Sequence, residues 1–143
     1  MAVNANDATL TGLAAAHTGS TAGHPAPNTP AAGSFDLILH AAAGSALGNS
    51  GTPYTLTISA IDLTAVIQGW PTLTLHQSFD AANGWKPSST GQGYQCTHTF
   101  PIIVPGGGPG GPLAGHTLQC VATLISRGAW IVSIIHSNPF VLV

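Results

Sequence analysis

Apolar and polar residues alternate with a period of two along most of the chain from residue 35 onward. Successive side chains of a β-strand point to opposite faces of a sheet, so this period predicts strands with one buried face. No window shows a sustained helical period with helix caps. The sequence therefore predicts an all-β protein, with alternating segments at 35–40, 54–59, 72–76, 94–100 and 117–124.

Clusters of glycine, proline, serine and asparagine separate these segments, as turn residues do between strands. A chain of 143 residues is long enough to form one domain around a single core. With a further strand expected over 8–13, the pattern predicts an antiparallel β-sandwich of about seven to eight strands. A closed barrel is the alternative.

Residues 14–34 consist of small residues and turn formers without periodicity. We therefore expect an extended N-terminal arm that contains no helix and makes few contacts with the core. The predicted division assigns residues 1–33 to an N-terminal strand and a Pro/Ala-rich arm, and residues 34–143 to the β-sandwich.

The alternation changes phase in one strand. Tyr54 and Ile58 occupy the apolar phase at first, and Ile61 and Leu63 take the apolar role afterwards. An extra residue in one strand produces such a phase change, so a β-bulge is expected near Ala60.

Charged residues are scarce, at 4% of the chain and without any glutamate. An ordinary soluble domain carries about 25%, and a free monomer uses such charges to stay apart from its neighbours. The composition therefore suits a protein packed against partners. One lysine and one arginine argue against binding to nucleic acid or to an anionic membrane. The charged residues are Asp7, Asp36, Asp62, Asp80, Lys86 and Arg127.

Apolar stretches such as 129–135 fall short of the ~20 residues that a membrane helix needs. The first residues lack the basic and apolar regions of a signal peptide. We expect a protein that is synthesised without a recognisable signal peptide and is located in a virion or an extracellular assembly.

The two cysteines, Cys96 and Cys120, lie on the inward phase of their segments, and the glycine-rich stretch 105–112 lies midway between them. A hairpin centred on Gly108 would place them opposite each other, with Cα atoms ~4.5–5.5 Å apart, within the range of a disulfide. They are therefore a disulfide candidate. The alternative is a pair of reduced, buried thiols.

The same hairpin would bring His98 and His116 beside the two cysteines, and two Cys with two His suit tetrahedral zinc. Their spacing matches no zinc-finger pattern, and side chains two residues apart on a strand lie ~7 Å apart. Neither a metal site nor a cofactor is predicted. The aspartates are isolated, no Gly-x-Ser-x-Gly motif occurs, and 105–112 lacks the lysine of a phosphate-binding loop, so an enzyme is not expected.

Two places are candidates for contacts with other molecules. Trp85 lies in a polar loop, where a tryptophan can stack on a ligand or a partner; alternatively it folds back onto its own core. The segment 129–143 is apolar on both faces, which indicates either burial inside the domain or an interface. Its interface candidates are Trp130, Val132, Ile134 and Phe140.

The last seven residues, Ser-Asn-Pro-Phe-Val-Leu-Val at 137–143, resemble the closing strand of immunoglobulin-like modules in bacterial and viral surface and decoration proteins. The resemblance implies an immunoglobulin-like sandwich and nothing specific about function.

From low charge, the arm and the missing signal, we expect a non-enzymatic structural subunit in a multi-copy assembly, as a virion decoration, capsid-accessory or filament protein. Its partners would be copies of itself or a major capsid or filament protein. The alternative is a secreted carbohydrate-binding or adhesive module that uses Trp85.

Overall fold

The computed structural model describes residues 4–16, 28–29, 34–64, 72–103 and 115–142. Apart from one 3-10 turn, η1, the regular elements of this part are all strands, which confirms the prediction of an all-β protein. None of its elements is a helix long and apolar enough to cross a membrane. The elements are β1 (Ala8–Ala16), β2 (Asn28–Thr29), β3 (Ser34–Ala43), β4 (Pro53–Asp62), β5 (Thr72–Ser78), η1 (Ala81–Asn83), β6 (Lys86–Pro87), β7 (Tyr94–Ile103), β8 (Thr117–Ser126), β9 (Ile131–His136) and β10 (Phe140–Leu142).

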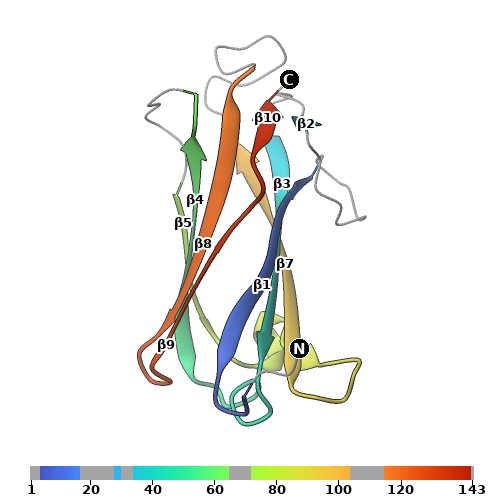
Figure 1. Ribbon diagram of the computed structural model, residues 1–143. Coiled ribbons are helices and arrows are strands. Elements are labelled where there is room, and N and C mark those ends of the chain that lie inside the picture. The colour runs from blue at the N-terminus through green and yellow to red at the C-terminus, as the bar shows by residue number, and fades with distance from the viewer. Residues whose placement is uncertain (1–3, 17–27, 30–33, 65–71, 104–114, 143) are drawn as a thin grey trace.

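The strands form two sheets that face each other (Figure 1). Sheet A has the order β1-β3-β7-β6, and sheet B has the order β2-β10-β8-β4-β5, with β9 also paired to β8. Neighbouring strands are antiparallel except for the short parallel pair of β10 and β2. The predicted antiparallel β-sandwich is confirmed.

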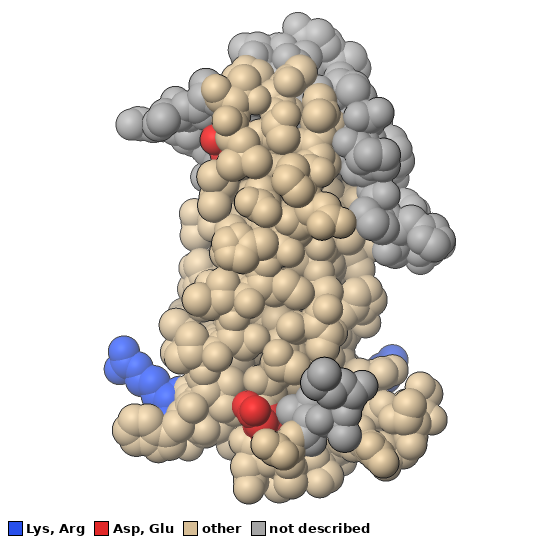
Figure 2. All heavy atoms as spheres, in the orientation of Figure 1, with Lys and Arg blue, Asp and Glu red and all other residues tan. Residues whose placement is uncertain are grey.

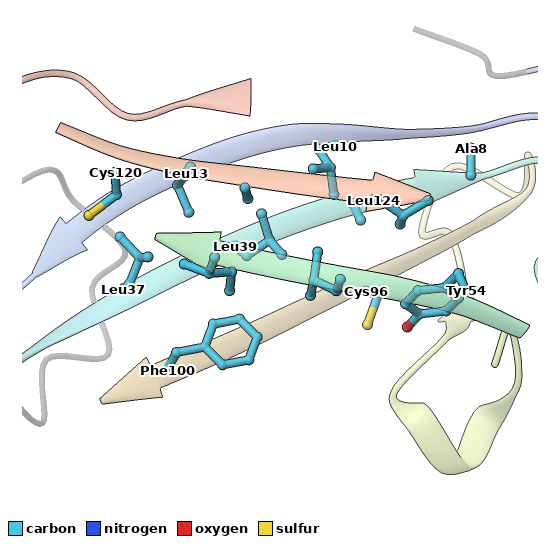
Figure 3. Close-up of a cluster of buried hydrophobic side chains, with 14 of the residues drawn as sticks. Ala8, Leu10, Leu13, Leu37, Leu39, Tyr54, Cys96, Phe100, Cys120 and Leu124 are labelled. Carbon is cyan, nitrogen blue, oxygen red and sulfur yellow. The ribbon is translucent and has the colours of Figure 1, made fainter. Parts of the chain in front are cut away.

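The inward faces of the two sheets form one hydrophobic core, as the alternation predicts (Figure 3). Burying one large aliphatic or aromatic side chain in such a core contributes ~1.5–3 kcal/mol to the stability of the fold. The core is closed at one end by Phe140, whose ring packs edge-on against Phe35 with centroids 5.2 Å apart. The most deeply buried side chains include Phe35, Phe79, Leu37, Leu39, Leu56, Ile58, Leu118 and Leu124.

The N-terminal strand belongs to this sandwich. β1 pairs with β3 from Ala8 to Ala16 and buries Leu10, Leu13 and Ala15. It is longer than predicted, so the expectation of few core contacts is wrong for residues 14–16. Asn28–Thr29 pair with β10, and the rest of the predicted arm lies outside the described residues.

The bulge expected near Ala60 is wrong. β4 pairs with β8 in unbroken register from Thr55 to Asp62, so the alternation simply continues. Ile61 therefore points outward and is exposed, as is Leu63 beyond the strand end. A register shift occurs instead in β1, between Leu10 and Gly12.

Candidate functional site

The β8–β9 hairpin presents three of the four predicted interface residues to solvent. Trp130 is 94% exposed, Val132 67% and Ile134 59%. Ile131 is buried and Ile135 packs partly against the core, so β9 buries one side and leaves an apolar side exposed. The sequence left two alternatives for this segment, burial inside the domain or an interface. In the structure the face of β9 that carries Val132 and Ile134 is exposed.

Phe140 differs from the other three. It is 3% exposed and packs against Phe35, so its ring belongs to the core. The prediction that Phe140 is an interface residue is wrong, because its ring closes the end of the sandwich and is not available to a partner.

The exposed apolar residues continue across sheet B. Val132 lies opposite Ile125, which is itself exposed, and Ile134 lies opposite Thr123. The outward positions of β4, β5, β8 and β9 hold no charged residue, and we call this surface the neutral face. Its outward residues are Thr55, Thr57, Ser59, Ile61, Thr72, Thr74, His76, Gln119, Val121, Thr123, Ile125, Val132, Ile134 and His136.

The charges that do occur lie elsewhere. On the side of the molecule shown in Figure 2, the charged side chains of the described residues, drawn in blue and red, lie toward the two ends of the molecule. The middle of this side shows none. The neutral face is thus a surface of hydroxyl, imidazole, amide and aliphatic groups.

Trp130 is held at the turn of the hairpin in an unusual backbone conformation. Its φ is 57°, which makes it the one non-glycine residue with positive φ among the described residues, and its N–H donates to the carbonyl of Arg127 over 3.3 Å. The left-handed region costs a non-glycine residue ~1–2 kcal/mol. Outliers of this kind concentrate at functional positions, so Trp130 is a candidate contact residue.

Trp85 is buried, and the hypothesis that it contacts a ligand or a partner is wrong. Asp80 caps η1 by accepting from the N–H of Asn83 over 3.0 Å, and Gly84, with φ at 87°, turns the chain back inward. Trp85 then lies in the core at 2% exposure, where its Nε1–H donates to Tyr54 Oη over 3.1 Å. The alternative, that this tryptophan folds back onto its own core, is the one observed.

The two cysteines do not share a hairpin. Cys96 lies on β7 of sheet A opposite Ala41, and Cys120 lies on β8 of sheet B opposite Ala60. Because β7 and β8 belong to different sheets, the thiols lie in opposite layers and near different ends of the core (Figure 3), and both are free. The predicted pairing is wrong, and the alternative of two buried thiols is observed.

The four residues considered for zinc do not come together in one site. His98 contacts Cys96, with Nε2 and Sγ 3.1 Å apart, whereas His116 contacts Asp62, with Nδ1 and Oδ2 2.7 Å apart. The described residues contain no group of three potential metal ligands.

The Cys96–His98 contact joins two neutral groups. Burial raises the pKa of the Cys96 thiol to about 11, against a smaller opposing effect of Lys86. Burial also lowers the pKa of His98, against a smaller opposing hydrogen bond to the Asn83 backbone. A reactive cysteine needs a lowered thiol pKa, so this pair lacks the property of a nucleophile.

A shallow groove of about 430 Å³ adjoins the neutral face at the β8–β9 hairpin. Thr55 and His76 form part of its wall, with Oγ1 and Nδ1 3.3 Å apart. The guanidinium-bearing Arg127 contributes a cation beside these neutral polar groups. The lining residues are Pro53, Tyr54, Thr55, His76, Gln77, Ile125, Arg127 and Gly128.

No protein-family model and no curated protein matches the chain. Among solved structures, it is similar to a protein from Bacteroides fragilis named as a beta-galactosidase, with 13% identity and a TM-score of 0.49. The match covers 92% of the present chain and 17% of that protein. A likeness this distant says nothing about what the present chain binds or does.

Proposed function

We propose that the protein is a non-enzymatic structural subunit that packs in a multi-copy assembly through its neutral face. The observation that carries this proposal is the exposed apolar side of the β8–β9 hairpin, where Trp130 at the turn and Val132 and Ile134 on β9 are all more than half exposed. Contiguous exposed apolar residues on a soluble domain indicate an interaction surface.

The absence of charge favours a second copy of the chain as the partner. An uncharged face opposes an identical face without like-charge repulsion, and its threonine hydroxyls can both donate and accept hydrogen bonds. Each large apolar side chain buried there contributes ~1.5–3 kcal/mol. Association costs ~4–15 kcal/mol, so several contacts per copy are needed, as a multi-copy assembly provides.

We infer the finer role from the sandwich fold and the low charge. An immunoglobulin-like sandwich with few charges suits a virion decoration, capsid-accessory or filament protein, located in a virion or an extracellular assembly. Its other partner would then be a major capsid or filament protein, which would meet the same neutral surface.

The test compares two placements of added positive charge. Val132→Lys with Ile134→Lys places charge on the neutral face, whereas Thr99→Lys places it on an exposed position of β7, on the outer side of sheet A. Sedimentation velocity should show wild-type protein associating with concentration. The double variant should associate at least ~10-fold more weakly, a change of ~1.4 kcal/mol.

The control, Thr99→Lys, should associate as wild type does, and all variants should keep the circular dichroism of a β-protein. Association should change little between ~0.05 and ~1 M NaCl, because neutral contacts are screened little. A wild-type protein that stays monomeric at high concentration, or equal weakening by Thr99→Lys, would contradict the proposal.

The groove lined by Gln77 and Arg127 supports a second candidate, a carbohydrate-binding or adhesive module. Trp85 is buried, so this candidate now depends on Gln77 and Arg127 in the groove and on the exposed Trp130. A monomer whose binding to a glycan array is lost on Arg127→Ala would favour this function over assembly.

A further inference from the structure

Strand β5 forms one end of sheet B. It pairs with β4 along its whole length, with Thr72 opposite Ser59 and Ser78 opposite Pro53. No other described strand pairs with it. Its inward residues Leu73 and Leu75 pack partly against the core, and its outward residues belong to the neutral face.

The hydrogen bonds beyond the end of β5 show which of its backbone groups face away from β4. The N–H of Phe79 donates to the carbonyl of Thr52 over 3.0 Å, and the carbonyl of Phe79 accepts from the N–H of Gly51 over 3.0 Å. Backbone groups of an antiparallel strand alternate sides, so the odd-numbered residues of β5 bond to β4. The N–H and C=O groups of Thr72, Thr74 and His76 therefore point to the open edge.

Proteins normally protect open strand edges with prolines, lysines, bulges or covering segments. β7, the edge of sheet A on the same flank, carries Pro101, and β6 with its Lys86 pairs with its first residues.

On the opposite flank, β1 is irregular between Leu10 and Gly12 and contacts β9. The N–H of Leu10 donates to Ser133 Oγ over 3.0 Å. β5 has no charged residue, no proline and no register shift. It is an unprotected edge of the described sandwich.

We propose that β5 pairs antiparallel with β5 of a second copy, which joins two copies of sheet B into one continuous sheet. Main-chain donors and acceptors on an edge are satisfied by another extended strand, and an uncharged strand meets its twin without repulsion. A two-fold axis near the middle of the strand sets the backbone groups of Thr72, Thr74 and His76 against the same groups of the copy.

This contact is separate from the one proposed for the apolar side of β9. It uses backbone groups at the edge of the sheet, whereas the other uses side chains on its face. Two self-complementary surfaces on one subunit link copies into an open row, in contrast to a closed dimer. The edge proposal stands or fails independently of the face proposal.

The test uses Thr74, whose N–H points to the open edge. Thr74→Pro removes this donor and leaves the hydrogen bonds between β5 and β4 in place, and Thr74→Lys puts a charge on the edge. The matched control is Thr57→Lys, which puts the same charge on the adjacent residue of β4, inside the sheet.

All three substitutions are made in protein that already carries Val132→Lys and Ile134→Lys, which removes the face contact. Sedimentation velocity should show this background and its Thr57→Lys derivative as dimers, and both Thr74 variants as monomers. Hydrogen exchange should show the amides of Thr72 and His76 protected in the dimer and exchanging at least ~10-fold faster in the Thr74→Lys monomer, because the edge donors are then open to water.

A background protein that is already monomeric would overturn the edge pairing. Dimers that persist in folded Thr74→Lys protein would overturn it as well. If the Val132 and Ile134 changes leave the wild-type association intact but Thr74→Lys abolishes it, the edge pairing holds and the face proposal fails.

Discussion

Removal of the buried thiol of Cys120 should change how stability depends on alkaline pH. Burial raises the pKa of this thiol from 9.0 to about 12. A thiol whose pKa is higher in the folded state than in the unfolded state stabilises the fold at every pH below the unfolded-state pKa. That stability is lost as the pH rises from the unfolded-state pKa toward the folded-state pKa. At pH ~10 the unfolded thiol is ~90% ionised while the folded thiol keeps its proton, which lowers the free energy of unfolding by ~1.4 kcal/mol.

The assay is urea unfolding at pH ~7 and pH ~10 with a phosphine reductant, for wild type and Cys120→Ala. The variant loses a few buried atoms and should be ~1 kcal/mol less stable at neutral pH. At pH ~10 wild type loses ~1.4 kcal/mol and the variant does not, because alanine has no proton to lose. The difference should therefore change sign, with Cys120→Ala ~0.4 kcal/mol more stable than wild type.

Leu124→Ala, buried on the same strand, is the matched control, and its difference from wild type should be the same at both pH values. If Cys120→Ala behaves like this control, the thiol ionises equally in both states. The placement of Cys120 as a free thiol in the core would then be refuted.

Two further substitutions test the turns and the acid response. Gly93→Ala should destabilise the fold by ~1–3 kcal/mol more than Gly91→Ala in urea unfolding, since a Cβ at Gly93 would lie 2.5 Å from the carbonyl oxygen of Ala43. Gly91 has a similar positive φ with nothing within 4 Å, so equal losses would contradict the close approach. Burial lowers the pKa of His98, so the unfolded chain takes up the proton first and stability should fall as the pH drops below ~6.5. His98→Gln should flatten this part of the profile in thermal melts at pH ~7 and ~5; an unchanged slope would contradict the assigned burial.

Local sequence was sufficient to locate the long strands and to say which side chains point inward along most of their length. The exception is the end of β4, where Ile61 was expected inward and is exposed. Tyr54, Leu56 and Ile58 are buried as their alternation predicts, and β9 buries Ile131 while exposing Val132. These outcomes depend on the two-residue period of a strand, which is a property of neighbouring residues alone. The same pattern also singled out the apolar outward side of β9 as an interface candidate.

The candidate site was only partly predictable, because burial of a loop side chain depends on where the loop folds. For both Trp85 and Trp130, the sequence left contact with a partner and burial in the core as alternatives. The cap at Asp80 and the turn at Gly84 carry Trp85 into the core, while the hairpin turn leaves Trp130 in solvent. The groove at Arg127 joins β4, β5 and the β8–β9 hairpin, and no local pattern contains it.

Which strands become neighbours was decided only by the tertiary structure. Alternation gives Cys96 and Cys120 the same inward direction whether their strands pair in one sheet or face each other across the core. In the structure β7 belongs to sheet A and β8 to sheet B, so these cysteines lie in opposite layers, and β5 is left with an open edge among the described strands. The two-residue period determines which side chains lie on the same face of a strand. The order of strands in a sheet depends instead on how distant segments pack together around one core.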